Sequence, residues 1–361
     1  MLLVVKLDCE ILMLRRQIMD RVLQNTNILL TGGAGFIGSH TCLALLETGC
    51  RVTLLDNFEN ARVDVPKRLE QISKCRIPVE HADIRNADEI ARIVARGDFD
   101  AVVHFAARKS VAESVSDPLG YYDSNCAGLL NVLKAMKAAG IKRFVFSSSA
   151  AIYGTSNVGP ISEDWPANPL NPYAETKLVG ENVLLALGRA NPDFRIGILR
   201  YFNPVGAHTS GLIGEDPRHP PSNLVPIIAR VAKGDLEKLT IFGGDWPTPD
   251  GTGIRDYIHV EDLARGHVLS LKALMGNGGS HLVNLGTGMG YSVLEVVRAY
   301  AEVSGRKIPF EIVDRRPGDA PISYASTERA RSVLGFEAKF DLSAMCASSW
   351  SHATSTLRDE Q

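Results

Sequence analysis

Tyr173 and Lys177 are the two side chains of this 361-residue chain whose types and spacing best suit acid–base chemistry. Asn171 is a good N-cap and Pro172 a good first helical residue, so a helix over 172–190 would carry both side chains on one face. A tyrosine is a poor base at its ordinary pKa of about 10. A lysine ammonium about 4 Å away, in a partly desolvated site, would favour the phenolate by about 4 kcal/mol. The alternative is a surface tyrosine and lysine with no shared role.

A run of three serines precedes this helix, at the end of an apolar strand predicted over 143–147. Its last member, Ser149, could hydrogen-bond a substrate oxygen and relay its proton to Tyr173. The alternative is a polar strand end that caps the next turn.

A glycine-rich run, Thr31-Gly32-Gly33-Ala34-Gly35-Phe36-Ile37-Gly38, lies between a predicted strand over 28–31 and a predicted helix over 37–47. Glycines at this point let the backbone turn tightly and approach a pyrophosphate at a helix N-terminus. Asp56 follows the next strand, 51–55, where a carboxylate accepts hydrogen bonds from an adenosine ribose and repels a 2′-phosphate. The pattern predicts NAD rather than NADP; a glycine turn that only packs helix on strand is the alternative.

Apolar strands alternate with helical patterns through the first half of the chain, which predicts a Rossmann-type doubly wound parallel sheet. A smaller C-terminal α/β substrate domain follows. We expect an N-terminal extension over 1–25, disordered or a short helix, an NAD-binding domain over 26–203, and a tail over 351–361. Residues 204–350 would bind mainly the substrate, with parts of 257–285 returning to the first domain. The further strands are predicted over 78–82, 101–105 and 195–201, and the further helices over 88–95 and 121–139.

Composition excludes several classes of function. Lys and Arg number 39 against 41 Asp and Glu, and the net charge of −2 provides no field for nucleic acid or an anionic membrane. The six cysteines and nine histidines show no metal-ligand spacing. We therefore expect no metal, reduced thiols and a cytoplasmic protein. Lys6, Asp8 and Glu10 interrupt the apolar N-terminus too soon for a signal peptide or a membrane span.

The order of these motifs resembles the extended short-chain dehydrogenase/reductase family, most closely its branch that epimerises UDP-hexoses at C4. The resemblance extends from about residue 27 to residue 350. The segments that carry it, besides the glycine-rich run, are Leu55-Asp56-Asn57, Asp83-Ile84-Arg85, His104-Phe105-Ala106-Ala107-Arg108-Lys109, Ser147-Ser148-Ser149-Ala150-Ala151-Ile152-Tyr153-Gly154, Leu199-Arg200-Tyr201-Phe202-Asn203-Pro204, Arg255-Asp256-Tyr257-Ile258-His259 and Arg315-Arg316-Pro317-Gly318-Asp319.

The resemblance implies a role for each matched position. The catalytic residues would be Ser149, Tyr173 and Lys177. The residues that contact NAD would be Gly32, Gly35, Phe36, Ile37, Asp56, Asn57, Asp83, Ile84, Phe105, Ala106, Lys109, Tyr173, Lys177 and Tyr201. Those that hold the UDP-hexose would be Ser149, Tyr173, Asn203, Asn223, Leu224, Phe242, Arg255, Arg316, Asp319 and Ser323. Two arginines suit a diphosphate, although surface ion pairing, for example of Arg316 with Asp319, is the alternative.

The reaction implied is the interconversion of UDP-glucose and UDP-galactose through transient oxidation at C4, with NAD kept bound, in a homodimer. The helices over 121–139 and 172–190 are the candidates for its interface. Ala151 and Ser124 depart from residues common in the family. A small side chain at Ser323 would leave room for a 2-acetamido group, so we also expect activity on the UDP-N-acetylhexosamine pair.

Other functions remain open at this stage. A nucleotide-sugar 4,6-dehydratase or decarboxylase begins with the same oxidation, but Ala150 and Ala151 stand where those enzymes typically carry an acid. A reductase that exchanges its cofactor would often prefer NADP, which Asp56 disfavours. A catalytically idle NAD-binding regulator would not need Ser149, Tyr173 and Lys177 together.

Overall fold

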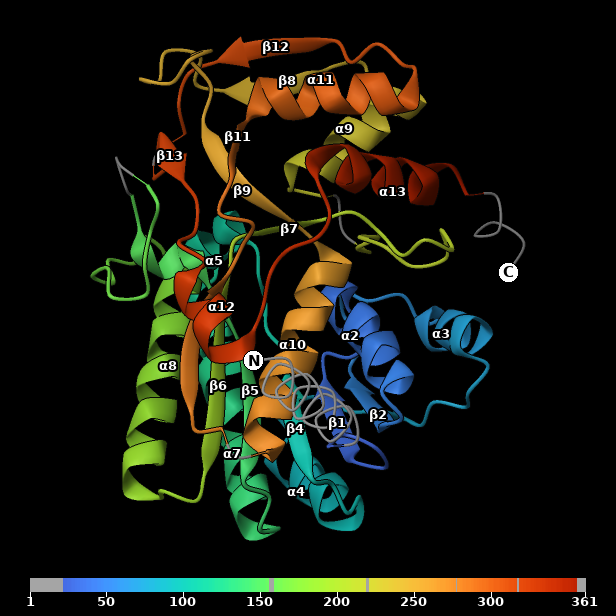
Figure 1. The fold of residues 1–361 in the computed structure, drawn as a ribbon, viewed down its shortest axis with the longest axis vertical. Coiled ribbons are helices and arrows are strands. Elements are labelled where there is room, and N and C mark those ends of the chain that lie inside the picture. The colour runs from blue at the N-terminus through green and yellow to red at the C-terminus, as the bar shows by residue number, and fades with distance from the viewer. Residues whose placement is uncertain (1–21, 156–158, 219–220, 277, 317, 356–361) are drawn as a thin grey trace, which may run out of the picture.

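A parallel sheet of seven strands forms the centre of the structure, a computed structural model that describes residues 22–155, 159–218, 221–276, 278–316 and 318–355 (Figure 1). The strand order is β10-β6-β5-β4-β1-β2-β3, and each neighbouring pair is parallel. The order reverses at β1, which has β2 on one side and β4 on the other; ligands of such sheets bind outside the carboxyl ends of the strands at this point. The strands are β1 Asn27–Thr31, β2 Arg51–Asp56, β3 Val79–His81, β4 Ala101–His104, β5 Arg143–Ser149, β6 Arg195–Tyr201 and β10 His281–Leu285.

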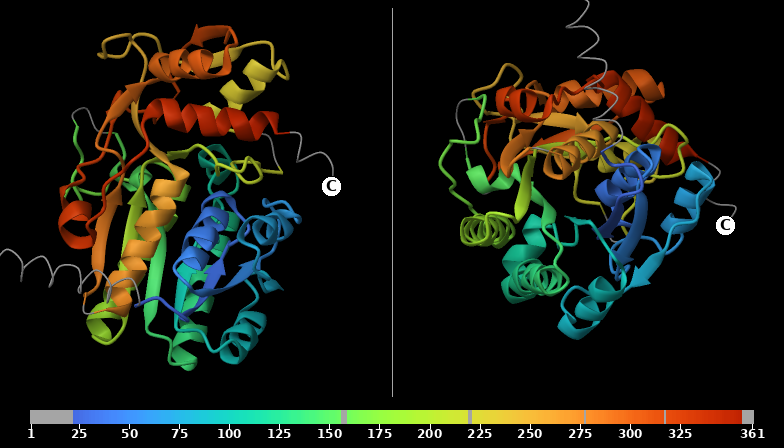
Figure 2. Two further views of the ribbon diagram at one scale, coloured as in Figure 1. Left: turned by 45° about the vertical axis from the view of Figure 1, so that its right-hand side comes forward. Right: turned by 60° about the horizontal axis from the view of Figure 1, so that its bottom comes forward.

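Helices cover both faces of this sheet, because successive strand residues point to opposite sides. In β1, Ile28 and Leu30 pack in the same apolar cluster as α2 and α10, whereas Leu29 packs in the cluster of α4, α7 and α8. Figure 2 shows the two helical layers from the side and from the lower end. The helices of these layers are α2 Phe36–Glu47, α3 Val65–Ser73, α4 Ala87–Arg96, α7 Gly128–Ala138, α8 Pro172–Ala190, α10 Val260–Met275 and α12 Glu328–Leu334. The predicted Rossmann-type fold is confirmed.

A smaller α/β part sits over the carboxyl ends of the strands, at the top of Figure 1. Four short strands form one sheet and two form another. Their apolar side chains share a cluster with three helices. The elements are β7 Asn203–Val205, β8 Leu239–Phe242, β9 Ile254–His259, β11 Gly290–Ser292, β12 Phe310–Val313, β13 Ile322–Ser323, α9 Leu224–Lys233, α11 Val293–Ser304 and α13 Leu342–Thr354. This part can close the space above the seven-stranded sheet.

One predicted helix is interrupted. The range 121–139 contains the end of α6 Pro118–Tyr122, then a π-helical turn, η1 Asp123–Ala127, and then α7. The turn has the sequence Asp-Ser-Asn-Cys-Ala, and these residue types do not distinguish a π-turn from a continuous α-helix. A π-turn widens the helix locally and frequently occurs at functional sites.

The chain ends differ from the predicted boundaries. Leu23 is fully buried and accepts a hydrogen bond from the Cys50 thiol, so the fold begins before residue 26. At the other end, α13 continues to Thr354, and Nδ1 of the buried His352 donates to the Gly211 carbonyl at 2.8 Å. The predicted extension over 1–21 and tail over 356–361 lie outside the described residues. In the part of the chain that the structure describes, no helix is long and apolar enough to cross a membrane.

Candidate active site

The glycine-rich run makes a tight turn from β1 into α2. Gly32 has a φ of +68°, and a Cβ there would lie 2.6 Å from the Ala106 backbone nitrogen. Any other residue would therefore be strained and would push the loop after β4 away. Gly35 is the N-cap of α2, whose first turn, beginning Phe36-Ile37, contains no acidic side chain. The first amides of a helix have no partner within it, so this N-terminus can bind a phosphate group.

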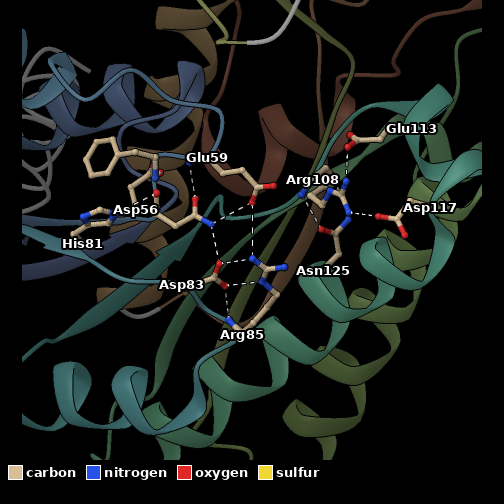
Figure 3. A network of polar contacts seen from close by, with 11 residues as sticks. Asp56, Glu59, His81, Asp83, Arg85, Arg108, Glu113, Asp117 and Asn125 are labelled. Atoms are coloured by element: carbon tan, nitrogen blue, oxygen red, sulfur yellow. Dashed lines mark hydrogen bonds and ion pairs between the residues drawn. The ribbon is translucent and has the colours of Figure 1, made fainter.

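Asp56 ends β2 beside this turn (Figure 3). One of its carboxylate oxygens accepts from the Ala34 amide at 3.0 Å and the other from the Phe58 amide at 2.9 Å. Burial raises the pKa of Asp56, while these two amides oppose that shift. Each oxygen keeps a second lone pair, so the carboxylate can still accept hydrogen bonds from ribose hydroxyls.

A second polar group lies at the end of the neighbouring strand, β3. Asp83 accepts from the Asn57 amide at 2.9 Å and from both Nε and Nη2 of Arg85, at 2.9 and 2.6 Å (Figure 3). The Arg85 hydrogen bonds hold the pKa of Asp83 well below its usual range. The adjacent Ile84 is buried, and Gly128 of α7 lies close against it. The structure thus gathers the predicted residues Asn57, Asp83 and Ile84 at one edge of the sheet.

The loop after β4 carries three more predicted cofactor residues, Phe105, Ala106 and Lys109. The Phe105 and Ala106 amides both donate to the Thr31 carbonyl, at 2.8 and 3.0 Å. This bifurcated contact fixes the loop against the glycine-rich turn. Lys109 lies further along and forms an ion pair with Glu215 at 2.8 Å.

Asn125 holds the same loop to the catalytic helix, a role that the sequence analysis missed. Its side-chain oxygen accepts from the Arg108 amide at 2.8 Å, and its nitrogen donates to the Arg108 carbonyl and to the Thr176 hydroxyl, each at 3.0 Å (Figure 3). Asn125 is buried and lies in the π-turn η1. Asn125 follows two other polar residues, Asp123 and Ser124, so the sequence did not single it out.

Ser149 and Tyr173 lie together above the carboxyl edge of the sheet. Ser149 is the last residue of β5, and its hydroxyl oxygen accepts from the Ala151 amide at 3.1 Å. Tyr173 lies in the first turn of α8, which starts as predicted with Asn171 as its N-cap. Burial raises the pKa of Tyr173, whereas a side-chain hydrogen bond with Ser149 and the positive charge of Lys109 lower it.

Lys177 contacts both the Tyr173 ring and the backbone of β5; the sequence did not predict the backbone contact. Its ammonium lies 5.9 Å from the centre of the Tyr173 ring and donates to the Ser147 carbonyl at 2.8 Å. Burial lowers the pKa of Lys177 to about 8. The charge of Lys109 lowers the Tyr173 pKa, a contribution that the sequence did not predict.

Tyr201 lies behind Tyr173, in a fully buried group of hydrogen bonds. Its hydroxyl contacts Nε2 of His267 in α10 and the Ser147 side chain. His267 places Nδ1 2.8 Å from the Leu263 carbonyl, and burial lowers its pKa to about 4. The neutral imidazole therefore carries its proton on Nδ1 and accepts from Tyr201 on Nε2.

The predicted sugar-nucleotide residues meet in the smaller part. Arg316 donates to Asp319 at 3.1 Å and lies 4.6 Å above the Phe242 ring. Arg255 lies 4.0 Å from the same carboxylate. Burial lowers the pKa of Arg255, and the charge of Arg316 lowers it further. The ion pair considered as an alternative is present, but two guanidinium groups share one carboxylate, which leaves a positive charge for a diphosphate.

Two further predicted residues are aligned with this cluster by strand pairing. Ser323 of β13 lies opposite Arg255 of β9, and Asn203 of β7 lies opposite Tyr257 of the same strand. Strand pairing thus places both residues on strands next to β9, which carries Arg255.

Asn223 and Leu224 start helix α9, with Asn223 as its N-cap. The Asn223 side chain donates to Glu215 Oε1 at 2.6 Å, the same oxygen that pairs with Lys109. Sequence reasoning marked the irregular stretch over 204–223 as functional but did not single out Glu215. A carboxylate without helical or strand periodicity around it gave no residue-level signal.

The stretch after Ser149 offers no further acid. It forms a 3₁₀ turn, η2 Ala150–Tyr153, in which only small and apolar residues follow the serine until Tyr153. Among the described residues, no three His, Cys, Asp or Glu side chains gather as metal ligands.

Comparison with known proteins agrees with this geometry. The family model described as "NAD dependent epimerase/dehydratase family" matches residues 28–301. The chain belongs to this family. It is 47% identical to the UDP-glucose 4-epimerase of Bacillus subtilis (strain 168), over 91% of this chain and 97% of that protein.

Solved structures of other members have the same architecture. The UDP-glucose 4-epimerase of Stenotrophomonas maltophila, with bound NAD and formylated UDP-arabinopyranose, superposes with a TM-score of 0.90 at 45% identity, covering 93% of this chain and all of that one. The UDP-glucose 4-epimerase of Bifidobacterium longum, in complex with NAD⁺ and UDP, has a TM-score of 0.88 at 45% identity, covering 92% and 99%.

Proposed function

We propose that this protein interconverts UDP-glucose and UDP-galactose, as an NAD-dependent UDP-glucose 4-epimerase. The observation that carries the proposal is the convergence of Ser149, Tyr173 and Lys177 at the carboxyl edge of the sheet that also carries the glycine-rich turn. Relatives at 45–47% identity are UDP-glucose 4-epimerases, and solved ones hold NAD together with UDP or a UDP-sugar.

NAD fits the residues at the carboxyl ends of β1 and β2. Gly32 leaves room for close backbone approach, the acid-free N-terminus of α2 suits the pyrophosphate, and Asp56 suits the adenosine ribose. The other residues proposed to contact NAD are Gly35, Phe36, Ile37, Asn57, Asp83, Ile84, Phe105, Ala106, Lys109, Tyr173, Lys177 and Tyr201. When bound, NAD supplies the acceptor for the C4 hydride and a positive charge beside Tyr173.

Tyr173 is the proposed general base. Its phenolate would take the proton of the sugar 4-hydroxyl, with Ser149 hydrogen-bonded to both oxygens, and would return the proton after the sugar has turned over. Lys177 holds the Ser147 carbonyl and so fixes the strand end that carries Ser149. Transfer of the proton from the sugar 4-hydroxyl would then pass through the hydrogen bond between Ser149 and Tyr173.

The smaller part is proposed to anchor UDP while the sugar rotates. Arg255 and Arg316 would bind the diphosphate in bidentate fashion, and Asp319 would accept from the uridine ribose. The remaining contacts would come from Asn203, Asn223, Leu224, Phe242 and Ser323. In this division, residues 26–203 bind NAD and 204–350 bind mainly the UDP-sugar, with parts of 257–285 in the first domain.

Ser323 underlies a proposed second substrate pair. Its small side chain, opposite Arg255, would leave space for a 2-acetamido group, so UDP-N-acetylglucosamine and UDP-N-acetylgalactosamine should also be interconverted. Ser323→Tyr should remove the acetamido activity and keep most of the activity on UDP-galactose. Equal loss of both activities, or of neither, would contradict this role.

The protein is proposed to work as a cytoplasmic homodimer. Apolar side chains are exposed along α6, α7 and α8, among them Leu119, 82% exposed, with Leu130 and Leu185. Five cysteines of the described residues are free, in keeping with a reducing compartment. Light scattering should give twice the mass of the chain, and Leu119→Lys together with Leu185→Lys should give the monomer.

The test of the activity is direct. Purified protein incubated with UDP-galactose and no added NAD should form UDP-glucose, resolved by NMR, without net NADH. Formation of no product even with added NAD would refute the proposal, provided that the protein is folded and binds UDP.

A further inference from the structure

Residues 215–218, here called the strap, contact the segments that follow β4 and β2, at the carboxyl edge of the sheet where the site lies. The strap belongs to the irregular segment between β7 and α9, yellow-green in Figure 1. At one end Glu215 pairs with Lys109, which follows β4. The next residue, Asp216, pairs with Arg62 at 2.9 Å, and Arg62 follows β2. In the sheet β1 lies between β4 and β2, so these two ion pairs connect the strap to the segments that follow the two neighbours of β1.

Arg218 adds two more ties on the β2 side. Its amide donates to the Asn60 carbonyl at 3.1 Å, and its guanidinium donates to the Phe58 carbonyl at 3.0 Å. The Phe58 amide in turn donates to Asp56. The strap is thus connected to the residue proposed to recognise the adenosine ribose.

Glu215 is the point at which the two halves of the site meet. One carboxylate oxygen, Oε1, accepts both from Lys109 Nζ at 2.8 Å and from Asn223 Nδ2 at 2.6 Å. Its side chain is only 9% exposed, whereas that of Lys109 is 50% exposed. Water therefore competes weakly for the carboxylate, and charge-assisted hydrogen bonds in such a place are stronger than those on an open surface.

We propose that Glu215 is a positioning residue that couples the two nucleotide sites, by holding Lys109 toward the cofactor and Asn223 toward the sugar nucleotide with one carboxylate oxygen. The inference rests on the proposed function for the assignment of Lys109 and Asn223. In this proposal Glu215 touches neither NAD nor the UDP-sugar, but it affects the affinity for both.

The experiment compares the wild-type protein with Glu215→Ala, both loaded with NAD. Two quantities are measured: the rate at which bound NAD exchanges with labelled NAD, and the dissociation constant of UDP by calorimetry. We expect NAD exchange to become about tenfold faster and UDP binding about tenfold weaker, the size expected when one charge-assisted hydrogen bond is lost from each ligand residue. A change in only one quantity, or in neither, would overturn the coupling.

Asp193→Asn is the matched control, because it removes one negative charge from another lysine–carboxylate pair, Lys142–Asp193, in the turn before β6 at the opposite end of the sheet. It should leave both quantities unchanged. If Glu215→Ala does not fold, Glu215→Gln is used instead, since its amide oxygen still accepts hydrogen bonds but carries no charge. Both quantities should then change by about threefold, and unchanged binding would overturn the proposal.

Neither readout requires turnover, so the two proposals can fail separately. If the wild-type protein binds NAD and UDP but does not interconvert the UDP-hexoses, the proposed function fails while the role of Glu215 is still tested. If the wild-type protein is an active epimerase and Glu215→Ala binds both ligands equally well, only the role of Glu215 fails.

Discussion

Replacing Lys177 with methionine should make the protein more stable near neutral pH and nearly inactive. Lys177 is 4% exposed, and its only charged partners act from a distance, so burial lowers its pKa from 10.5 to about 8. Each pKa unit corresponds to about 1.4 kcal/mol, so holding the charged form in the folded protein costs about 3 kcal/mol below pH 8. Methionine has a similar volume and no charge.

The gain from this substitution is smaller than the full cost of the charge. The hydrogen bond from Lys177 to the Ser147 carbonyl is lost, which leaves a buried acceptor unpaired at a cost of about 1–2 kcal/mol. The net effect at pH 7.5 is therefore an increase of about 1–2 kcal/mol in the free energy of unfolding. Activity should fall by at least about 10³-fold, because the group that fixes the Ser149 strand end beside Tyr173 is gone.

The pH dependence gives the sharper test. A lysine whose pKa is lower in the folded state binds fewer protons there than in the unfolded chain between pH 8 and 10.5, so the stability of the wild-type protein rises with pH in this window. Relative to Lys177→Met, it should rise by about 2 kcal/mol between pH 7.5 and 9.5. Urea unfolding of both proteins after removal of NAD measures this difference, because bound NAD would stabilise the two proteins unequally.

Lys142→Met is the matched control, because Lys142 is half-exposed in a surface ion pair. Its stability relative to the wild type should stay constant over the same pH range. A Lys177→Met variant that is less stable than the wild type at pH 7.5, with a difference that does not change with pH, would refute the reasoning about the buried charge.

Three other substitutions test separate parts of the structure. Tyr173→Phe should lose at least about 10³-fold in turnover but keep NAD and UDP bound, as followed by NMR and calorimetry; substantial residual activity would exclude the proposed base. Arg200→Met should lower the free energy of unfolding by about 3–5 kcal/mol in urea, because it leaves the buried Glu181 carboxylate, 2.6 Å from Arg200, without its partner. Arg200→Met combined with Glu181→Leu should recover most of that loss. A double variant as unstable as Arg200→Met would show that lost packing, rather than an unpaired buried charge, causes the destabilisation. Gly32→Ala should yield protein with little bound NAD, measured by absorbance after denaturation, because the new Cβ would lie 2.6 Å from the Ala106 nitrogen; full NAD content would contradict the close approach.

The strands and the first half of the site could be predicted from the sequence because they rest on local signals. Buried parallel strands are short apolar runs, and the helix over 172–190 has both its N-cap and its proline in place. The role of Gly32 could be predicted because a tight turn after a strand requires glycine. The role of Asp56 could be predicted because an acid directly follows the next strand. These features depend on residues that are close together in the sequence.

The contacts that hold the site together could not be predicted in the same way. Lys109 and Glu215 are 106 residues apart, and Glu215 lies in a segment without periodicity. The Lys177 ammonium lies over the Tyr173 ring and also donates to a backbone carbonyl of β5, 30 residues away, which the sequence did not predict. A carbonyl is present at every residue, so no sequence pattern distinguishes this one. The π-turn that places Asn125 likewise has a sequence that an ordinary α-helix could also have.

The most direct test of the central claim follows the hydrogen at C4 of the sugar. UDP-galactose labelled with deuterium at C4 is incubated with the protein in ordinary water, without added NAD, and the UDP-glucose formed is examined by NMR. Transient transfer to a cofactor that stays bound predicts that deuterium remains at C4 of the product. Loss of the label to solvent, or UDP-glucose that carries it at another carbon, would contradict the account.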